Sequence, residues 1–311
     1  MNKTIQNAVK AAIIICIAIL ILTQALHYKP RPTKTLTTTT EQSITVDHKE
    51  PVVKRLVVAS LKADDTTWLQ KRLPDWAVSR YVVDDLNSPL TVPLNKGRES
   101  MVYLTYIIDN YDTLADINVF IHSLQYQWHN DDPNKDGATV ISRLQLPHIR
   151  QQGYVNMRCA WTLGCPAEIR LDDPSDNRET TSHFRQAFQE LFPERADNIP
   201  TNVGASCCAQ FAVTAAKLRE KPKAEYERIR NWVRDTPLAD DVSGRIMEYS
   251  WHMFFGMPDV HCPDARTCYC AVFGLCDLQN CAQWGCPTQY QLPPFSTMPE
   301  GWKQLAEYDN I

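Results

Sequence analysis

The sequence predicts an α/β protein with a mixed, mostly parallel sheet and flanking helices, a C-terminal disulfide-rich segment and one N-terminal transmembrane helix. Three observations lead to this prediction. Between residues 55 and 121, short apolar runs alternate with helical patterns, as in proteins whose strands are joined through helices. Residues 11–26 are almost wholly apolar. Residues 262–286 contain six of the eleven cysteines.

The apolar run predicts a signal-anchor helix that stays in the mature chain. It is about 16 residues long, and Lys10 can extend it because its charged end can reach the membrane surface. The alternative is a cleaved signal peptide, since Thr23 and Ala25 are small enough for a peptidase site. Lysines and arginines flank both sides, so charge gives little bias in orientation.

The cysteines decide the predicted orientation and location. Disulfides form in oxidising compartments, so we expect a single-pass membrane protein with its C-terminal domain lumenal (ER or Golgi) or extracellular. Composition then divides the chain into five parts: a short tail and anchor (1–29), a Thr- and Pro-rich stem (30–51), an α/β lumenal domain (52–260), a Cys-rich segment (261–290) and an irregular tail (291–311).

The charge balance argues against one class of partner. The chain has a formal net charge of −4 with 22% charged residues, whereas a nucleic-acid surface needs a basic face. We therefore expect a membrane partner for the anchor and no nucleic acid.

The expected elements follow from apolar periodicity and from breaker residues. Residues 66–73 form a helical pattern that stops at Pro74, and residues 100–111 place their apolar side chains mainly on one helical face. The predicted strands are 55–60, 79–83, 117–121 and 154–161. The predicted helices are 66–73, 100–111, 138–151 with a break at Pro147, 180–191, 223–233 and 243–255.

Polar residues follow two of these strands, where ligands of parallel sheets bind. Asp84 and Asp85 come after the second strand and suit a divalent metal or a ribose hydroxyl, although Asp is also common in plain turns. His122 ends the third strand and could shuttle protons or bind metal, against an ordinary structural hydrogen bond. The identity of any metal stays open.

Two further sites are expected from local spacing. Lys96 and Arg98 flank a glycine before a helix, a pattern that suits a diphosphate, although a solvated helix start explains it equally well. Glu248 and His252 are four residues apart in a predicted helix, beside Trp251. Such a pair can act as a general base and the group that orients it, or form a surface or buried structural pair.

Ten cysteines are expected to form disulfides, because the six in the tail contain no Cys-x-x-Cys pair of the kind that structural zinc sites use. Cys207 and Cys208 are adjacent, and we expect each to find a separate partner, since a bridge between neighbours is strained. The candidates are Cys159, Cys165, Cys207, Cys208, Cys262, Cys268, Cys270, Cys276, Cys281 and Cys286.

Four blocks of sequence resemble a known family. The runs NKGRESMVYLTYIIDNYDTLADINVFIHS, CCAQFAV, GRIMEYSWHMFFG and CPDARTCYCAVFGLC are similar to a fungal family catalogued as domain of unknown function 3431. The resemblance covers roughly residues 55–276 and implies a fungal source and a single-pass anchor. It implies no established activity.

A more remote resemblance is to nucleotide-sugar glycosyltransferases, which also begin strand–helix–strand and often carry an anchor and a stem. Glu248 and Trp251 are similar to acceptor-side residues in some of them. Those enzymes commonly carry Asp-x-Asp after a central strand, where this chain has His122 and Ser123, so metal-assisted transfer is in doubt. A divalent metal stays possible as a cofactor, and Lys96, Arg98 or a helix dipole is the alternative source of positive charge.

The first functional hypothesis is therefore a lumenal glycosyltransferase-like enzyme acting on a nucleotide-sugar and a glycan. Asp84 and Asp85 would bind the nucleotide or metal, and Glu248 would act as the base with His252 orienting it. The rival is a non-catalytic, disulfide-stapled, membrane-tethered domain that binds partners or glycans. A third reading is a hydrolase or an oxidoreductase that uses the adjacent cysteines.

Overall fold

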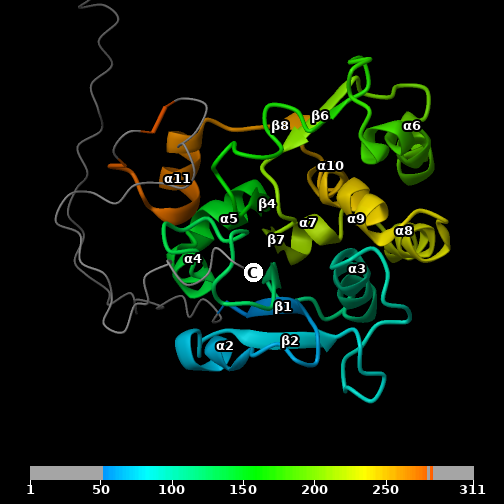
Figure 1. Ribbon diagram of the computed structural model, residues 1–311. Helices are drawn as coiled ribbons and strands as arrows, with labels where there is room; N and C mark the ends of the chain where they lie inside the picture. Colours follow the sequence, from blue (N-terminus) through cyan, green and yellow to red (C-terminus); the bar gives the residue numbers. More distant parts are fainter. Residues whose placement is uncertain (1–51, 279–280, 283–311) are drawn as a thin grey trace, which may run out of the picture. The chain divides into compact units, whose positions relative to one another are not determined.

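The computed structural model describes residues 52–278, 281 and 282 (Figure 1). The predicted anchor and stem, Cys286 and the C-terminal tail lie outside these residues. Within the described ranges, no helix is both long and apolar enough to cross a membrane.

A five-stranded mixed sheet, in the order β2-β1-β3-β7-β4, forms the centre of the described region (Figure 1). Strand β1 is parallel to β2 and β3, whereas β7 is antiparallel to β3 and β4. The predicted parallel arrangement thus holds for the first three strands, and the sheet as a whole is mixed. The strands span Lys54–Ser60 (β1), Ala77–Val82 (β2), Ile117–His122 (β3), Tyr154–Asn156 (β4) and Phe211–Thr214 (β7).

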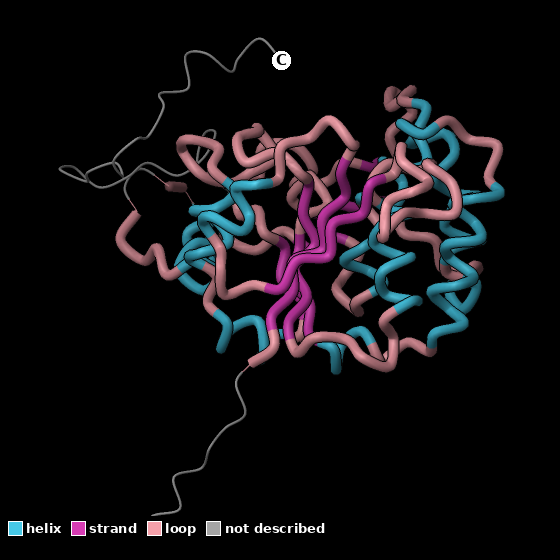
Figure 2. Tube along the Cα trace, turned by 90° about the horizontal axis from the view of Figure 1, so that it is seen from below, coloured by secondary structure: helices cyan, strands magenta, loops and turns pink. Residues whose placement is uncertain are grey.

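Helices cover both faces of this sheet, as Figure 2 shows. On one face lie α2 (Thr67–Arg72), α4 (Gly137–Arg143), α5 (Leu146–Gln152) and α11 (Ala265–Phe273), whose buried side chains share one hydrophobic cluster. On the other face lie α3 (Ser100–Asp109), α6 (Glu179–Leu191), α7 (Ala215–Leu218), α8 (Lys223–Asp235), α9 (Asp240–Glu248) and α10 (Trp251–Phe254).

Strand β3 is buried on both faces, which explains its unbroken apolar sequence. Val119 belongs to the cluster on the α4 side, and Phe120 packs on the other side against Tyr103 and Phe211 at centroid distances of 4.9 Å each. The one polar side chain in the middle of this strand, Asn118, is satisfied by the Tyr106 hydroxyl at 2.6 Å and the Ala115 carbonyl. Burial of these aromatic rings supplies much of the driving force for folding.

The predicted elements of the first half are confirmed with small shifts in their ends. The helix expected at 138–151 is interrupted before Pro147 and forms α4 and α5, and the helix expected at 243–255 forms α9 and α10. Strand β4 is shorter than predicted. Five short elements were not predicted: β7, α7 and a three-stranded sheet of β5 (Ile169–Arg170), β6 (Asn202–Ala205) and β8 (Val260–His261).

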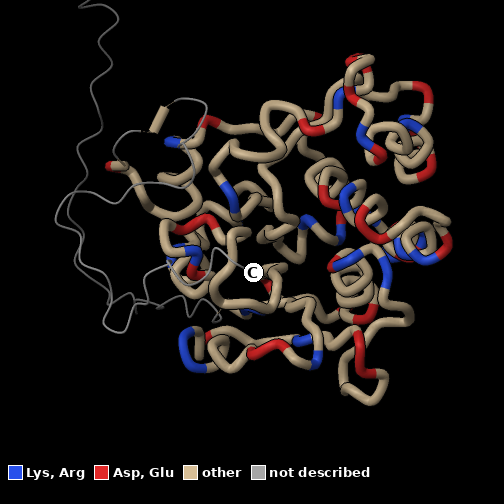
Figure 3. Tube along the Cα trace, in the orientation of Figure 1, with Lys and Arg blue, Asp and Glu red and all other residues tan. Residues whose placement is uncertain are grey.

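The cysteine-rich segment contains helix α11, which was not expected from the sequence pattern. The Asp264 side chain accepts a hydrogen bond from the Thr267 amide at its start, and Gly274 ends it with a φ of 70°. A 3-10 turn at Pro193–Arg195 (η1) completes the described elements. Basic and acidic residues are interspersed along α6, α8 and α9 (Figure 3).

Disulfides join distant parts of the described chain, as expected from the cysteine count. Cys159 pairs with Cys268 and Cys165 pairs with Cys262, across 109 and 97 residues. Closing one loop of about 100 residues restricts the unfolded chain and stabilises the fold by roughly 4.7 kcal/mol in the chain-entropy treatment. The second bond adds less, because its loop lies inside the first. Cys270 pairs with Cys276, and Cys281 is also disulfide-bonded.

The prediction for Cys207 and Cys208 is wrong, because the two form a disulfide with each other. The chain turns sharply here: Cys208 and Ala209 have φ values of 90° and 47°, between the ends of β6 and the start of β7. This tight turn accommodates both sulfurs on the same short segment. The local sequence alone gave no sign of this backbone conformation.

The loop before α3 is held against α8 and α9, and this placement decides which of its side chains reach the site. The Lys96 ammonium donates to the Thr236 carbonyl, and the Gly97 amide donates to Asp240 at 3.2 Å. Gly97 has a φ of 66°, and a Cβ there would lie 2.5 Å from Val233 Cγ1. Only glycine therefore fits this position.

Gly97→Ala is expected to lower the free energy of unfolding by about 2–4 kcal/mol, because it adds a clash to a left-handed backbone. Urea unfolding followed by circular dichroism measures the change. Gly256→Ala is the matched control: its φ is 78°, but its Cβ would meet nothing nearer than Lys217 Nζ at 3.9 Å. Equal losses for the two variants would show that the contact with Val233 contributes nothing.

Candidate functional site

A cleft of about 500 Å³ lies beyond the carboxyl ends of β1 and β3. Ala59, Ser60 and Leu61 line it from β1 and its end, and His122 and Ser123 from the end of β3. This is the place where open sheets with parallel strands bind ligands. The other lining residues come from the start of α3, from α9 and from the loops between other elements: Asp64, Val83, Asn95, Arg98, Glu99, Trp128, His129, Leu163, Cys207, Cys208, Gly244, Arg245, Glu248 and Tyr249.

Two largely buried carboxyl groups lie in this cleft. Burial raises the pKa of Glu99 to about 8, and the nearby charge of Glu248 adds to the rise. Burial also raises the pKa of Glu248, while the Cys208 amide and Arg245 oppose that rise. Glu99 therefore carries its proton at pH 7 and can donate a hydrogen bond or a proton.

Two histidines line the cleft, His122 beside Glu99 and His129 beside His122, and both are neutral at pH 7. Their rings are 4.6 Å apart between centroids, and burial lowers the pKa of His122 to about 4 and that of His129 to about 3. His122 Nε2 lies 3.8 Å from a Glu99 carboxyl oxygen and has no hydrogen-bond partner within the described ranges. A neutral imidazole next to a protonated carboxyl can relay a proton without creating a buried charge.

Two arginines bring positive charge to the cleft. Arg245 Nε lies 3.3 Å from Glu248 Oε2 and therefore fixes the orientation of that carboxyl group. Arg98 is exposed, and the described part of the chain offers it no ion-pair partner. An exposed guanidinium without a carboxylate partner is available to an anionic ligand.

Apolar side chains are exposed at the same cleft. Leu61, Trp128 and Leu163 are 47%, 46% and 53% exposed. Ligand sites typically combine such apolar walls with a few convergent polar groups. The cleft thus offers a flat indole, a cation and two carboxyl groups to one ligand.

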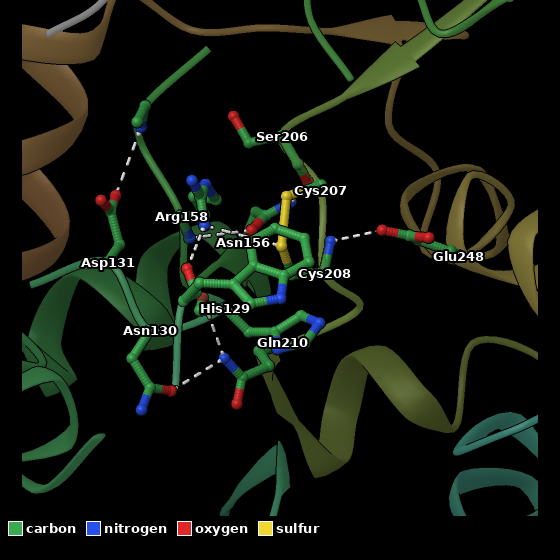
Figure 4. Close-up of a disulfide and its surroundings, with 12 residues drawn as sticks. His129, Asn130, Asp131, Asn156, Arg158, Ser206, Cys207, Cys208, Gln210 and Glu248 are labelled. Atoms are coloured by element: carbon green, nitrogen blue, oxygen red, sulfur yellow. Dashed lines mark hydrogen bonds between the residues drawn. A yellow bond between two sulfur atoms is a disulfide. The ribbon is translucent and has the colours of Figure 1, made fainter. Parts of the chain in front are cut away.

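The Cys207–Cys208 disulfide forms part of the wall of this cleft, and Figure 4 shows its surroundings. Glu248 points from α9 toward Cys208 and accepts a hydrogen bond from its backbone amide. On the other side, Arg158 Nη1 lies 3.6 Å from Cys208 Sγ and 3.0 Å from the Trp128 carbonyl. The disulfide segment therefore connects the acidic side of the cleft to the loop that carries Trp128.

Three of the predicted site residues meet in the cleft, namely Arg98, His122 and Glu248. Asp84 and Asp85 do not line it. Asp84 accepts the Lys62 amide at 2.7 Å, and Asp85 pairs with the Lys62 ammonium at 2.9 Å, so both serve the turns after β1 and β2. Lys96 is held by Thr236, as described above, and likewise stays away from the lining.

The predicted pairing of Glu248 with His252 does not form. Helix α9 ends at Glu248 and α10 begins at Trp251, so the two side chains do not share one helical face. His252 is 1% exposed, its Nε2 lies 3.0 Å from the Asp259 carbonyl, and burial lowers its pKa to about 4. Trp251 is 1% exposed and packs against Tyr103 and Phe211 in the core.

Several residues of the cleft were not singled out as site residues from the sequence. Glu99 and Arg245 are the main ones, whereas Trp128 and His129 belong to the polar and aromatic run after His122, where the sequence predicts a pocket. Glu99 adjoins the predicted Arg98, and that adjacency was the one available signal. Arg245 lies three residues before Glu248, and this helical spacing was the one signal that the two side chains could form an ion pair.

One group of side chains has the spacing of a metal site. Ligand atoms of Cys207, Cys208 and Glu248 all lie within 4.8 Å of one another. The two sulfurs are joined in a disulfide, however, and thiolate charge is what makes cysteine a strong metal ligand. With the two cysteines oxidised to a disulfide, these three residues fit a metal ion poorly.

Comparisons with known proteins place the chain in a family but supply no activity. A family model described as "Protein of unknown function (DUF3431)" matches residues 56–271. No curated protein matches the sequence. A solved structure, glucosyl-3-phosphoglycerate synthase from Mycobacterium tuberculosis in complex with Mn²⁺, UDP-glucose and phosphoglyceric acid, has 14% identity, covers 67% of this chain and 81% of its own, and has a TM-score of 0.29.

Glu99→Gln is expected to stabilise the chain in a defined pH window. Between pH 4.5 and 8, unfolded Glu99 loses its proton while the folded residue keeps it, so rising pH favours unfolding of the wild type. The neutral amide removes this loss, by on the order of 3 kcal/mol at pH 7. Thermal unfolding from pH 4 to 8 should show no difference at pH 4 and a growing advantage above it.

The exposed Glu194→Gln is the control for this substitution, and it should show no such trend. A parallel pH dependence of Glu99→Gln and wild type would mean that Glu99 is ionised in the folded chain.

Proposed function

We propose that this chain, which belongs to the DUF3431 family, uses its cleft to transfer a sugar from a nucleotide donor to an acceptor hydroxyl. One observation carries the proposal: a buried carboxyl pair, an unpaired arginine and an exposed tryptophan converge at the carboxyl ends of two parallel strands. Sugar transfer needs a base for the acceptor, positive charge for the leaving diphosphate and a surface for the sugar ring.

Glu248 is assigned the role of base. Its burial raises its pKa toward the working range of a general base, and the Cys208 amide and Arg245 hold its two oxygens in place. The acceptor hydroxyl would lose its proton to Glu248 as its oxygen bonds to the anomeric carbon of the donor. His252, which faces Asp259, has no part in this step.

Arg98 is assigned to the leaving diphosphate. In the acceptor reaction the bond between the anomeric carbon and the diphosphate breaks, and negative charge grows on the departing oxygen. Arg98 is the cleft cation that no described carboxylate engages. Neutral Glu99 adds a hydrogen-bond donor without adding negative charge. Trp128 offers its exposed indole to the sugar ring.

The location belongs to the same proposal. The chain would be held by an anchor within residues 1–29, with the described domain in the lumen of the secretory pathway. The long-range disulfides Cys159–Cys268 and Cys165–Cys262 support an oxidising compartment.

Arg98→Ala is expected to weaken binding of nucleotide-sugars by at least about tenfold, because it removes the cation that faces the diphosphate. Calorimetric titration of the purified full-length chain with UDP- and GDP-sugars, with and without Mn²⁺, measures it. The exposed Arg185→Ala on α6 is the matched control and should bind as wild type does. Absence of any nucleotide-sugar binding to the wild type, under either condition, would contradict the proposal.

Glu248→Gln is expected to lower the rate of transfer by about 10²–10⁴-fold with little change in donor affinity, as loss of a general base does. Release of nucleotide diphosphate in the presence of an acceptor glycan measures the rate. A domain that only binds glycans, which the exposed Trp128 would also allow, predicts donor-independent glycan binding and no diphosphate release in the wild type.

A further inference from the structure

The Cys207–Cys208 bond differs from the other described disulfides in what it does for stability. Disulfides stabilise a fold by closing a loop in the unfolded chain, and the effect grows with loop length. Cys159–Cys268 and Cys165–Cys262 span 109 and 97 residues, whereas Cys207 and Cys208 are neighbours. A bond between neighbouring residues encloses no intervening chain. Loop closure therefore does not explain why the Cys207–Cys208 bond is present.

The position of the Cys207–Cys208 bond lets small molecules reach the two sulfurs but excludes proteins. Cys207 and Cys208 are 3% and 4% exposed, yet both line the cleft of about 500 Å³. A small thiol can enter such a space, while a protein surface cannot reach the sulfurs directly. Cys159, by contrast, is 1% exposed and packs within the core on the α11 side.

A buried arginine next to Cys208 favours thiol–disulfide exchange at this bond. Arg158 is 5% exposed, and its Nη1 lies 3.6 Å from Cys208 Sγ. Its Nε atom is buried and has no hydrogen-bond partner within the described ranges. A buried guanidinium beside a sulfur stabilises the thiolate form and makes that sulfur the better leaving group.

We propose that Cys207–Cys208 is a redox-active pair that exchanges with small dithiols entering through the cleft. The reductant's thiolate attacks Cys207 Sγ, the S–S bond breaks, and its electron pair goes to Cys208 Sγ beside Arg158. The second thiol of the reductant then attacks the mixed disulfide, which frees Cys207 and leaves the reductant as a cyclic disulfide. Two electrons and two protons pass to the protein, which ends with two thiols.

This site is independent of sugar transfer, because it involves the sulfurs and Arg158 rather than a sugar or nucleotide. It bears on Glu248 all the same, since the amide that holds this carboxyl group belongs to Cys208. The experiment therefore measures which cysteines are reduced and does not measure an enzymatic rate. Its outcome does not depend on whether the chain transfers sugar.

The full-length chain is equilibrated with graded ratios of reduced to oxidised dithiothreitol, alkylated with iodoacetamide and mapped by peptide mass spectrometry. Cys207 and Cys208 are expected to be alkylated at a dithiol ratio at least about tenfold lower than Cys159, Cys268, Cys165 and Cys262. Reduction of the long-range pairs first would overturn the proposal, as would a different partner for Cys207 or Cys208 in the untreated chain. This measurement needs no variant and so does not depend on a mutant that folds.

Two sets of variants sharpen the result. After mild reduction, a phenylarsenical that bridges two thiols should be captured by the wild type and by Cys270→Ser/Cys276→Ser, but not by Cys207→Ser/Cys208→Ser. Arg158→Gln should slow reduction of the pair by about tenfold, while the exposed Arg150→Gln leaves the rate unchanged. Capture that survives loss of Cys207 and Cys208, or an unchanged rate in Arg158→Gln, would contradict the assignment.

Discussion

The antiparallel insertion of β7 beside β3 is the constraint on which the cleft depends. Because the two strands run in opposite directions, Phe211 at the start of β7 pairs with Phe120 near the end of β3. The segment before β7 therefore arrives at the same edge of the sheet as His122. Gln210 accepts a hydrogen bond from the His122 amide at 3.2 Å and donates to the loop at His129. A parallel β7 would carry Cys207 and Cys208 to the opposite edge.

Desolvation then sets the chemistry of the groups brought together. A buried carboxyl or imidazole avoids charge where it can, so Glu99 keeps its proton and His122 and His129 give theirs up. The cleft thereby holds several titratable groups at pH 7 without the repulsion of several like charges. Arg98 and Arg245 carry their charge at the exposed side of the cleft, where water can solvate it.

The sequence supported the local elements but not their long-range placement. The strands near residues 55, 79 and 117 were predicted because apolar periodicity is a local property, while the four-residue β7 carries too little pattern to separate it from a buried turn. Asp84 and Asp85 looked like ligands because the sequence does not show that Lys62 reaches them. In the 95–99 loop, positive φ at Gly97 and Arg98 turns Lys96 toward Thr236 and leaves Arg98 at the cleft, a choice made by backbone conformation.

The sequence also gave no sign of the break between α9 and α10. For this reason the predicted pairing of Glu248 with His252 was wrong. A spacing of four residues predicts a shared face only if the helix continues, and here it stops between them. The Ser250 hydroxyl bonds to the Ile246 carbonyl at 2.7 Å, the local competition with helical hydrogen bonding that serine allows. The break turns Trp251 and His252 into the core and leaves Glu248 as the last residue of α9, pointing at Cys208.

The described part of the cysteine-rich segment contributes no residue to the lining of the cleft, but it holds one of the loops that form the wall of the cleft. Helix α11 shares a hydrophobic cluster with α4 and α5, and its Tyr269 hydroxyl donates to Asp131 at 2.8 Å. Asp131 also accepts the Cys159 amide at 2.6 Å, so one buried carboxyl group joins α11 to two loops. Burial raises the pKa of Asp131 while Arg158 and these donors oppose the rise, which ties this carboxyl group electrostatically to the residue beside the Cys208 sulfur. Because the loop that contains Asp131 also carries Trp128 and His129, the C-terminal disulfides fix the wall of the cleft without touching a ligand.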